Sequence, residues 1–289
     1  MNIKDFYQSE KSGKPIQENA GVNVIYFTNR CNLACTYCYE ELSGRPKQVL
    51  SKEQIIKSID AILNREKPEE QTLFVLFGGE VTLEWENALF FMEYAYSKKK
   101  NVHFNISTNG IKFLNDDFIK EYKKLKFNIL GLTSIDISFD GVGNKERVTH
   151  SGKDTTFTML EVFKKLNQYK VEFRLRYTIH KLNINKLYED INYIAKTIKP
   201  KRIITSVAWS QLCEKEVKHL EEVKHKLRFE WNNNLITIPV CEMFCDTCNG
   251  CGVRKEIKTY FSDEGNVTTF KNNESAPKFN DFKQKEKND

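Results

Sequence analysis

The sequence predicts an α/β protein with one large domain around a parallel sheet, followed by a small cysteine-rich domain. Short β-rich runs alternate with longer helical stretches in about six strand–helix units over residues 20–230, as in a parallel sheet. The composition then changes abruptly, and residues 240–253 hold four of the eight cysteines. We expect an N-terminal extension (1–20), the α/β domain (21–231), the cysteine-rich domain (232–271) and a flexible polar tail (272–289).

Each expected element has its own signal in the sequence. The strands are β-rich runs at 21–28, 71–79, 102–110, 132–141, 171–179 and 201–209. Helices follow them at 51–66, 85–99, 115–125, 155–169, 184–198 and 213–231. The first helix is typical, because Ser51 can cap it and Ile55, Ile59 and Ile62 recur at helical spacing. Near the C-terminus, residues 258–270 predict a β-hairpin, since two β-rich arms flank an Asp-Glu-Gly-Asn turn.

Composition and charge restrict the classes of partner. Of the 289 residues, 40% are hydrophobic and 29% are charged, which suits a folded chain with a sizeable core. The net charge of +6 is small and evenly spread, so it indicates no nucleic-acid partner. No apolar run approaches the roughly 18 residues of a membrane span, and the N-terminus is too polar for a signal peptide. We therefore expect a cytoplasmic protein with reduced thiols and no membrane partner; the oligomeric state stays open.

The first cysteine motif directly follows the first expected strand. Cys31, Cys35 and Cys38 are spaced C-x3-C-x2-C, and thiolates in a cytosolic protein bind iron–sulfur clusters or zinc. Three ligands on one loop can hold three corners of a cubane cluster and leave its fourth iron open. The alternatives are a zinc site with a ligand from elsewhere, or three unrelated buried thiols. The position favours a functional site, because barrel folds place their sites at the carboxyl ends of strands.

With Tyr37 just before the last cysteine, this motif resembles that of the radical S-adenosylmethionine (SAM) superfamily. Three further segments at successive strand ends carry the resemblance. Gly78-Gly79-Glu80 is similar to the family's GGE motif, with Val81 where proline is common; Ser107-Thr108-Asn109-Gly110 resembles its STNG segment; and Ser138-Phe139-Asp140-Gly141 resembles the S-x-D-G of its peptide- and protein-modifying members. Four motifs in the right order make a chance match hard to sustain.

The resemblance implies a partial (β/α)6 barrel and a [4Fe–4S] cluster held by Cys31, Cys35 and Cys38, whose open iron binds SAM. It implies that the backbone at Gly78 and Gly79 and the Glu80 side chain hold the amino group of the methionine moiety. Further residues would line the cofactor pocket: Tyr37, Ser107, Asn109, Ser138, Asp140 and Arg147. A flavodoxin- or ferredoxin-type reductant would supply the electron that cleaves SAM, and the resulting 5′-deoxyadenosyl radical would abstract hydrogen from the substrate.

A second cysteine group predicts a closed metal site. Cys241, Cys245, Cys248 and Cys251 can complete an auxiliary [4Fe–4S] cluster or a tetrahedral zinc site. The single compact run is closer to ferredoxin spacing, which favours iron and sulfur. Together with the hairpin, the segment from Cys251 resembles the start of the auxiliary-cluster domains called SPASM or twitch. No cysteine follows Cys251, so we expect one auxiliary cluster at most and not the two of anaerobic sulfatase maturases.

Cys213 remains after both groups are assigned. It is either a small buried hydrophobic residue at a helix start or a hydrogen-atom donor to a substrate radical, as in radical SAM members that convert L- to D-residues in ribosomal peptides. We expect a radical SAM maturase of a ribosomally made peptide, with Cα epimerisation as the favoured outcome. The alternatives are oxidative carbon–carbon or thioether crosslinking, a small-molecule or nucleoside reaction, and a non-catalytic zinc or iron–sulfur protein.

Overall fold

The computed structural model of the chain describes residues 22–38, 47–143, 145–207, 212–233, 240–241 and 257–260. They contain one parallel sheet of eight strands in the order β7-β6-β5-β4-β3-β2-β1-β8. The strands are β1 (Val22–Thr28), β2 (Thr72–Gly78), β3 (Val102–Thr108), β4 (Thr133–Ser138), β5 (Arg174–Ile179), β6 (Arg202–Val207), β7 (Val240–Cys241) and β8 (Ile257–Tyr260). Six longer strands in sequence order therefore form the sheet, and two short strands form its edges.

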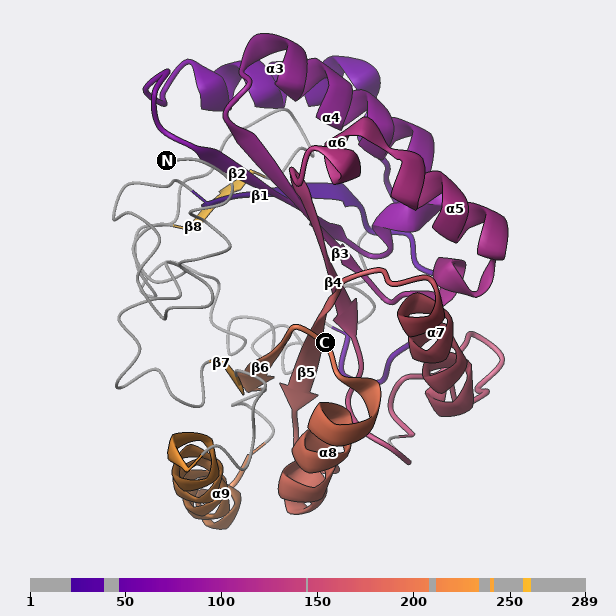
Figure 1. Cartoon of the computed structure of the whole chain (residues 1–289), viewed down its shortest axis with the longest axis vertical. Helices are drawn as coiled ribbons and strands as arrows, with labels where there is room; N and C mark the ends of the chain where they lie inside the picture. The colour runs from indigo at the N-terminus through magenta and orange to yellow at the C-terminus, as the bar shows by residue number, and fades with distance from the viewer. Residues whose placement is uncertain are drawn as a thin grey trace, which may run out of the picture.

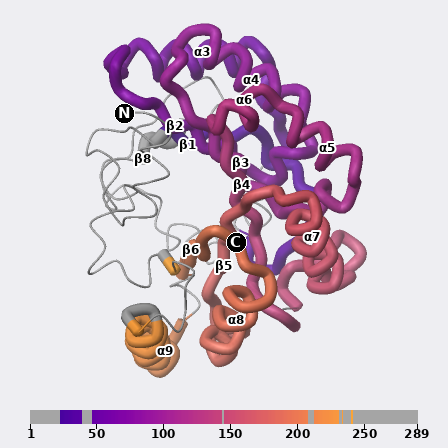
Figure 2. Tube along the Cα trace, in the orientation of Figure 1, coloured from indigo at the N-terminus to yellow at the C-terminus, as the bar shows by residue number. Residues whose placement is uncertain are grey.

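The sheet is curved, and the helices cover its outer face (Figure 1). They are α3 (Lys52–Leu63), α4 (Trp85–Lys98), α5 (Asp116–Lys124), α6 (Lys126–Ile129), α7 (Thr156–Gln168), α8 (Leu187–Tyr193) and α9 (Glu214–Asn232). Figure 2 shows the chain passing repeatedly from a strand to a helix on this outer side and back to the next strand. An open, curved parallel sheet of this kind confirms the partial (β/α)6 barrel.

The predicted strands are all present, and their ends lie within a few residues of the expected positions. One predicted helix differs in detail. Residues 184–198 form a 3-10 turn (η3, Ile184–Lys186), helix α8 and a π turn (η4, Ile194–Ile198) in succession. The π turn closes where Lys199 adopts the left-handed conformation, with φ at 55°, and its N–H donates to the carbonyl of Ile194. This cap turns the chain toward β6.

The two faces of the sheet differ in chemistry. On the outer face, Phe74 and Phe104 are fully buried, and Phe74 meets Phe91 of α4 edge-to-face, with ring centroids 5.1 Å apart. Burying each such ring stabilises the fold by about 1.5–3 kcal/mol. On the inner face, the alternate residues of β3, β4 and β5 are polar: His103, Asn105, Ser107, Ser134, Asp136, Ser138, Arg174, Arg176 and Thr178. The apolar outer face therefore stabilises the fold, and the polar inner face is left for function.

The structure describes only part of the predicted C-terminal region. Residues 257–260 are a strand, as expected for the first arm of the hairpin, and they pair in parallel with β1. The second arm lies outside the described residues, so the hairpin and the boundary of the cysteine-rich domain stay predictions. The described helices include none that is both long and apolar enough to cross a membrane.

Candidate active site

The cysteine motif lies on a loop that follows β1 and is fixed by a segment beyond β4. The N–H of Ala34 donates to the carbonyl of Val148 at 2.8 Å, and the N–H of Thr36 donates to the carbonyl of Glu146 at 3.0 Å. The Thr36 hydroxyl also bonds the Glu146 carboxylate. Leu33 is buried between these contacts. The loop is thus held in place from a distant part of the chain.

The three thiols of this loop share one environment. All three side chains are half-buried, and burial raises the pKa of Cys31 to about 11, with the charges of Glu80, Cys35 and Cys38 acting in the same direction. Burial also raises the pKa of Cys35, against the nearby positive charge of Arg147. The thiols of Cys31 and Cys35 are therefore protonated at neutral pH until a metal displaces the protons.

The chemistry of the loop is compatible with a four-iron cluster. Across the described ranges, no three His, Cys, Asp or Glu side chains converge on the position of one ion. A [4Fe–4S] cluster does not need that convergence, because each thiolate binds a different corner iron. Cys31, Cys35 and Cys38 are close enough to affect one another electrostatically, and one loop carries them all. The loop therefore offers ligands for three corners of such a cluster.

Gly78 and Gly79 bring the end of β2 against the start of the cysteine loop. Gly79 donates its N–H to the Thr28 carbonyl at 2.6 Å. A Cβ at Gly78, where φ is +140°, would overlap that carbonyl oxygen, and a Cβ at Gly79 would overlap the carbonyl oxygen of Arg30. Only glycine permits this approach of two backbones. The glycine pair therefore positions the loop, whatever further contact it makes with a ligand.

Glu80 is fully buried, and its carboxylate joins the ends of β2 and β3. Oε1 accepts from the Thr82 N–H at 2.9 Å, the Thr82 hydroxyl at 2.6 Å and the Thr108 hydroxyl at 2.7 Å. Oε2 accepts from the N–H of Asn109 at 2.6 Å. Four donors of the protein thus satisfy this carboxylate, which makes it a structural support for the site. The expected contact of Glu80 with the methionine amino group stays a prediction.

Asn109 links the end of β3 to the cysteine loop. Its Nδ2 donates to Asn32 Oδ1 at 2.7 Å and lies 3.8 Å from Cys31 Sγ. Its Oδ1 accepts from the N–H of Ile111 at 3.1 Å, which fixes the orientation of the amide. Ser107, two residues earlier, is on the inner face of the sheet. The STNG segment is therefore in contact with the first cysteine.

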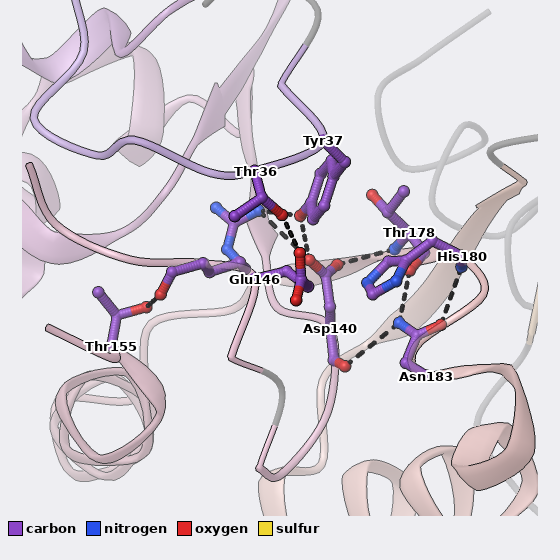
Figure 3. Close-up of polar contacts among 9 residues, drawn as sticks. Thr36, Tyr37, Asp140, Glu146, Thr155, Thr178, His180 and Asn183 are labelled. Carbon is purple, nitrogen blue, oxygen red and sulfur yellow. Dashed lines mark hydrogen bonds and ion pairs between the residues drawn. The ribbon is translucent and has the colours of Figure 1, made fainter. Parts of the chain in front are cut away.

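Half-buried Tyr37 contacts two buried residues, Asp140 and Arg147; Figure 3 labels Tyr37 and Asp140. The Tyr37 hydroxyl bonds Asp140 Oδ2, and Arg147 Nη1 donates to the Tyr37 oxygen at 2.9 Å. Arg147 Nη1 is also 3.6 Å from Asp140 Oδ2. Burial raises the pKa of Tyr37 well above its usual value, so the hydroxyl keeps its proton and can donate. Arg147 Nε is buried without a partner among the described residues.

The sequence did not indicate the residues that complete this group. The N–H of Thr178, near the end of β5, donates to Asp140 Oδ1 at 2.8 Å. The His180 ring packs against Tyr37 with centroids 5.1 Å apart, and burial lowers the pKa of His180. Asn183 fixes the His180 backbone through a 2.9 Å hydrogen bond. The sequence feature that could have indicated His180 is its position directly after the fifth expected strand.

The remaining site candidates lie apart from this group or outside the described part of the chain. Ser138 is at the carboxyl end of β4 and half-buried. Cys213 precedes α9, is exposed, and donates its N–H to Glu216 Oε2 at 2.7 Å. An exposed thiol does not fit the alternative of a buried hydrophobic cysteine. Cys241 ends β7, but its side chain is outside the description, as are Cys245, Cys248 and Cys251.

Comparison with protein families identifies this arrangement. A family model described as the radical SAM superfamily matches residues 25–194, more than half of the chain. The chain belongs to the radical SAM superfamily. Membership implies a [4Fe–4S] cluster and SAM as cofactors, and the cysteine loop fits the cluster. The auxiliary cluster and the twitch or SPASM domain stay predictions.

Two curated radical SAM relatives have names that refer to maturation. The cysteine-type anaerobic sulfatase-maturating enzyme of Clostridium novyi is 27% identical over 175 residues, which cover 56% of this chain and 45% of that protein. The sporulation killing factor maturation protein SkfB of Bacillus subtilis is 27% identical over 172 residues, which cover 59% of this chain and 38% of that protein. In both cases the match spans less than half of the relative's length.

Solved radical SAM structures share the fold. The structure of anSMEcpe with bound AdoMet and Cp18Cys peptide has a TM-score of 0.63 and 17% identity, covering 88% of this chain and 74% of that chain. Streptococcus suis SuiB bound to the precursor peptide SuiA has a TM-score of 0.56 and 14% identity, covering 89% of this chain and 61% of that chain. At these identities the similarity shows the fold alone.

Proposed function

We propose that this radical SAM enzyme modifies a ribosomally synthesised peptide. The carrying observation is that all four sequence motifs meet at the carboxyl ends of β1 to β4. Asn109 and Glu80 support one side of the cysteine loop, and Asp140 binds Tyr37 on the other. The fourth motif, Ser138 to Gly141, resembles the S-x-D-G segment of peptide- and protein-modifying members. The names of the C. novyi and B. subtilis relatives, and the peptides bound to anSMEcpe and SuiB, support a peptide substrate.

The chain offers residues to hold both cofactors. Cys31, Cys35 and Cys38 would bind the cluster, and SAM on its open iron would supply a radical that takes hydrogen from an unactivated carbon. Arg147 is the cation beside Cys35, and its Nε has no partner in the described part of the chain. It would pair with the carboxylate of the methionine moiety. Asp140 would hold Arg147 in place, with Ser138 close to the ribose.

The favoured reaction is Cα epimerisation, with Cys213 as hydrogen-atom donor. Loss of a hydrogen atom from Cα leaves a planar radical, and return of a hydrogen atom to the opposite face inverts the residue. Cys213 supports this role because its thiol is exposed and the residue follows β6. The sulfur radical left behind must then take up one electron and one proton. A flavodoxin- or ferredoxin-type reductant, with an auxiliary cluster at Cys241, Cys245, Cys248 and Cys251, would supply the electron. Such free thiols suit the cytoplasm.

The experiment uses the anaerobically reconstituted enzyme and short peptides synthesised from any small open reading frames that adjoin its gene. Iron and sulfide content and release of 5′-deoxyadenosine test the radical SAM assignment. Mass spectrometry of the peptide then separates the reactions. In heavy water, an epimerase exchanges one Cα hydrogen of the peptide for deuterium, whereas a crosslinking enzyme removes two hydrogens. An unmodified peptide under conditions where SAM is cleaved would contradict the peptide substrate.

A matched pair of variants tests the donor. Cys213→Ser removes the thiol and should retain iron and SAM cleavage while it abolishes deuterium incorporation. Ser97→Cys, on the last turn of α4, adds back a thiol at a distance from the site and should not rescue the reaction. If Cys213→Ser still incorporates deuterium, another group is the donor.

A further inference from the structure

The inner face of the sheet is positively charged next to the candidate active site, on the side toward the amino ends of the strands. Leu175 and Ile203 are buried in the outer-face core, so strand alternation puts their neighbours Arg174, Arg176 and Arg202 on the inner face. Asp136 is the only acidic residue on the inner face of the described strands β1 to β6. Burial lowers the pKa of His103 to about 3, so it adds no positive charge at neutral pH.

Asp136 holds two of these arginines. Arg174 Nε donates to Oδ1 at 2.6 Å, and Arg176 Nε donates to Oδ2 at 2.9 Å. Complete burial acts to raise the pKa of Asp136, but the two guanidinium groups outweigh it and the pKa is lowered. Asp136 is thus ionised at neutral pH. One negative and two positive charges leave this group with a net positive charge.

Arg176 has donors left over. A guanidinium has five N–H donors, and the Nε of Arg176 is the group that bonds a described residue. Its side chain is 32% exposed. Because Nε is fixed on Asp136, the terminal Nη groups are held in a defined orientation. They form the planar pair of donors that matches the two oxygens of a carboxylate.

Arg202 adds a second charge next to this pair. The register aligns Arg202 with Arg174 and aligns Ile204 with Arg176. Arg202 is therefore a diagonal neighbour of Arg176, about 8 Å away between Cα atoms, given the spacing of strands and residues. No ion pair joins Arg202 to any of the described acidic residues. The described residues therefore leave the positive charge of Arg202 without an acidic partner.

The position of Arg176 along β5 places it close to the candidate active site. Arg176 precedes Thr178 by two residues, and the Thr178 N–H holds Asp140. Two residues along a strand correspond to about 7 Å. Arg176 is in register with Ser138 at the carboxyl end of β4. A substrate that reaches the candidate active site from the inner face therefore has Arg176 within one or two residues of the carbon that reacts.

We propose that Arg176, with Arg202 beside it, binds a carboxylate of the substrate next to the residue that is modified. The proposal rests on the proposed function, because it takes the substrate to be a peptide. The carboxylate is an aspartate or glutamate side chain or the peptide's C-terminus. A neutral or basic residue at this position would leave the Nη pair without a charged acceptor, so the site selects acidic segments.

The test is peptide selection by the reconstituted holoenzyme with SAM. The immobilised protein is incubated with a random heptapeptide library, N-acetylated and C-amidated, and retained peptides are sequenced by mass spectrometry. We expect aspartate and glutamate together to rise at least threefold over the input in their share of the residues at the most enriched position of the retained peptides. A second library with free C-termini distinguishes the two carboxylate sources, since enrichment there without side-chain acids assigns the C-terminus. No enrichment in either library overturns the proposal.

Variants assign the enrichment to the arginines. Arg176→Gln should reduce it to the input level, and a retained acidic peptide should bind about tenfold more weakly to that variant. Arg176→Lys keeps the charge but not the donor pair and should recover only part of the affinity. Arg202→Gln leaves the ion pairs of Asp136 intact and should weaken binding by a smaller factor. Arg65→Gln, an exposed arginine after α3, is the matched control and should change nothing.

The outcomes also separate this proposal from the proposed function. Acidic peptides that bind through Arg176 but are never modified would keep the carboxylate site and contradict the peptide maturase. A peptide that is modified but has no carboxylate near its altered residue would support the peptide maturase and contradict the carboxylate site. Weakened SAM binding in Arg176→Gln, with unchanged peptide selection, would assign Arg176 to the cofactor and overturn the carboxylate site.

Discussion

The N–H of Asn109 donates to the carboxylate of Glu80 at 2.6 Å, so the end of β3 is held by a residue from the end of β2. The same Asn109 side chain lies 3.8 Å from Cys31 Sγ. A buried acid therefore supports the first cysteine through one intermediate residue.

Replacement of Glu80 should loosen this support. In Glu80→Gln, one oxygen becomes an NH2 group, which either faces the Asn109 N–H or displaces the three bonds to Oε1. An unsatisfied buried donor costs about 1–3 kcal/mol. We expect a free energy of unfolding lower by about that amount in urea, and loss of iron on anaerobic gel filtration. Glu86→Gln, at an exposed position of α4, is the control and should behave as wild type. Full iron retention by Glu80→Gln would show that the support is dispensable.

The Tyr37 hydroxyl bridges Asp140 and Arg147. Tyr37→Phe should leave the fold intact and release Arg147 from its fixed position. Because hydrogen bonds to charged groups contribute about 1.5–3 kcal/mol, SAM should bind roughly tenfold more weakly or worse, as measured by calorimetry on the reconstituted enzyme. Tyr188→Phe loses a surface hydrogen bond to Glu230 and is the matched control. An unchanged affinity for SAM in Tyr37→Phe would remove this group from the cofactor site.

Gly78 should be much less tolerant of a side chain than Gly143. Both have positive φ, but a Cβ at Gly78 would overlap the Thr28 carbonyl, whereas a Cβ at Gly143 would meet nothing within 4 Å. Gly143→Ala should cost about 1 kcal/mol of stability through backbone strain. Gly78→Ala should cost about 3 kcal/mol more and displace the cysteine loop. Equal melting temperatures of the two variants would contradict the close approach of the backbones.

His103 makes stability depend on pH. Burial lowers its pKa from 6.5 to about 3 in the folded state. Between these values the unfolded chain binds a proton that the folded chain does not, so the free energy of unfolding falls as pH drops below 6.5. The loss attributable to His103 reaches about 2 kcal/mol at pH 5. Urea titrations should show this slope in wild type and in His225→Gln, at an exposed position of α9, and a flatter one in His103→Gln. Parallel slopes in all three proteins would contradict a neutral His103.

Sequence periodicity predicted the strands and the helices that follow them, because burial of one face leaves a regular trace in the chain. It also predicted that Cys31, Glu80, Asn109 and Asp140 share one edge, since parallel strands end together. It could not predict that the Glu80 carboxylate accepts the N–H of Asn109, because that depends on contacts between two strands. His180 was missed for the same reason. A lone histidine has no pattern, and only the fold brings it to Tyr37.

The cysteine loop also has a consequence for biosynthesis. Its fixing contacts join residues that are far apart in sequence: Thr36 and Glu146 are separated by 110 positions, and Tyr37 and Asp140 by 103. Contacts with such long separations form late, after the intervening strands have paired. As the ribosome releases the chain, Cys31 to Cys38 emerge first, but the contacts with Glu146 and Asp140 can form only after the segment beyond the fourth strand has been made. The cysteine loop therefore reaches its fully supported conformation only in a nearly complete barrel.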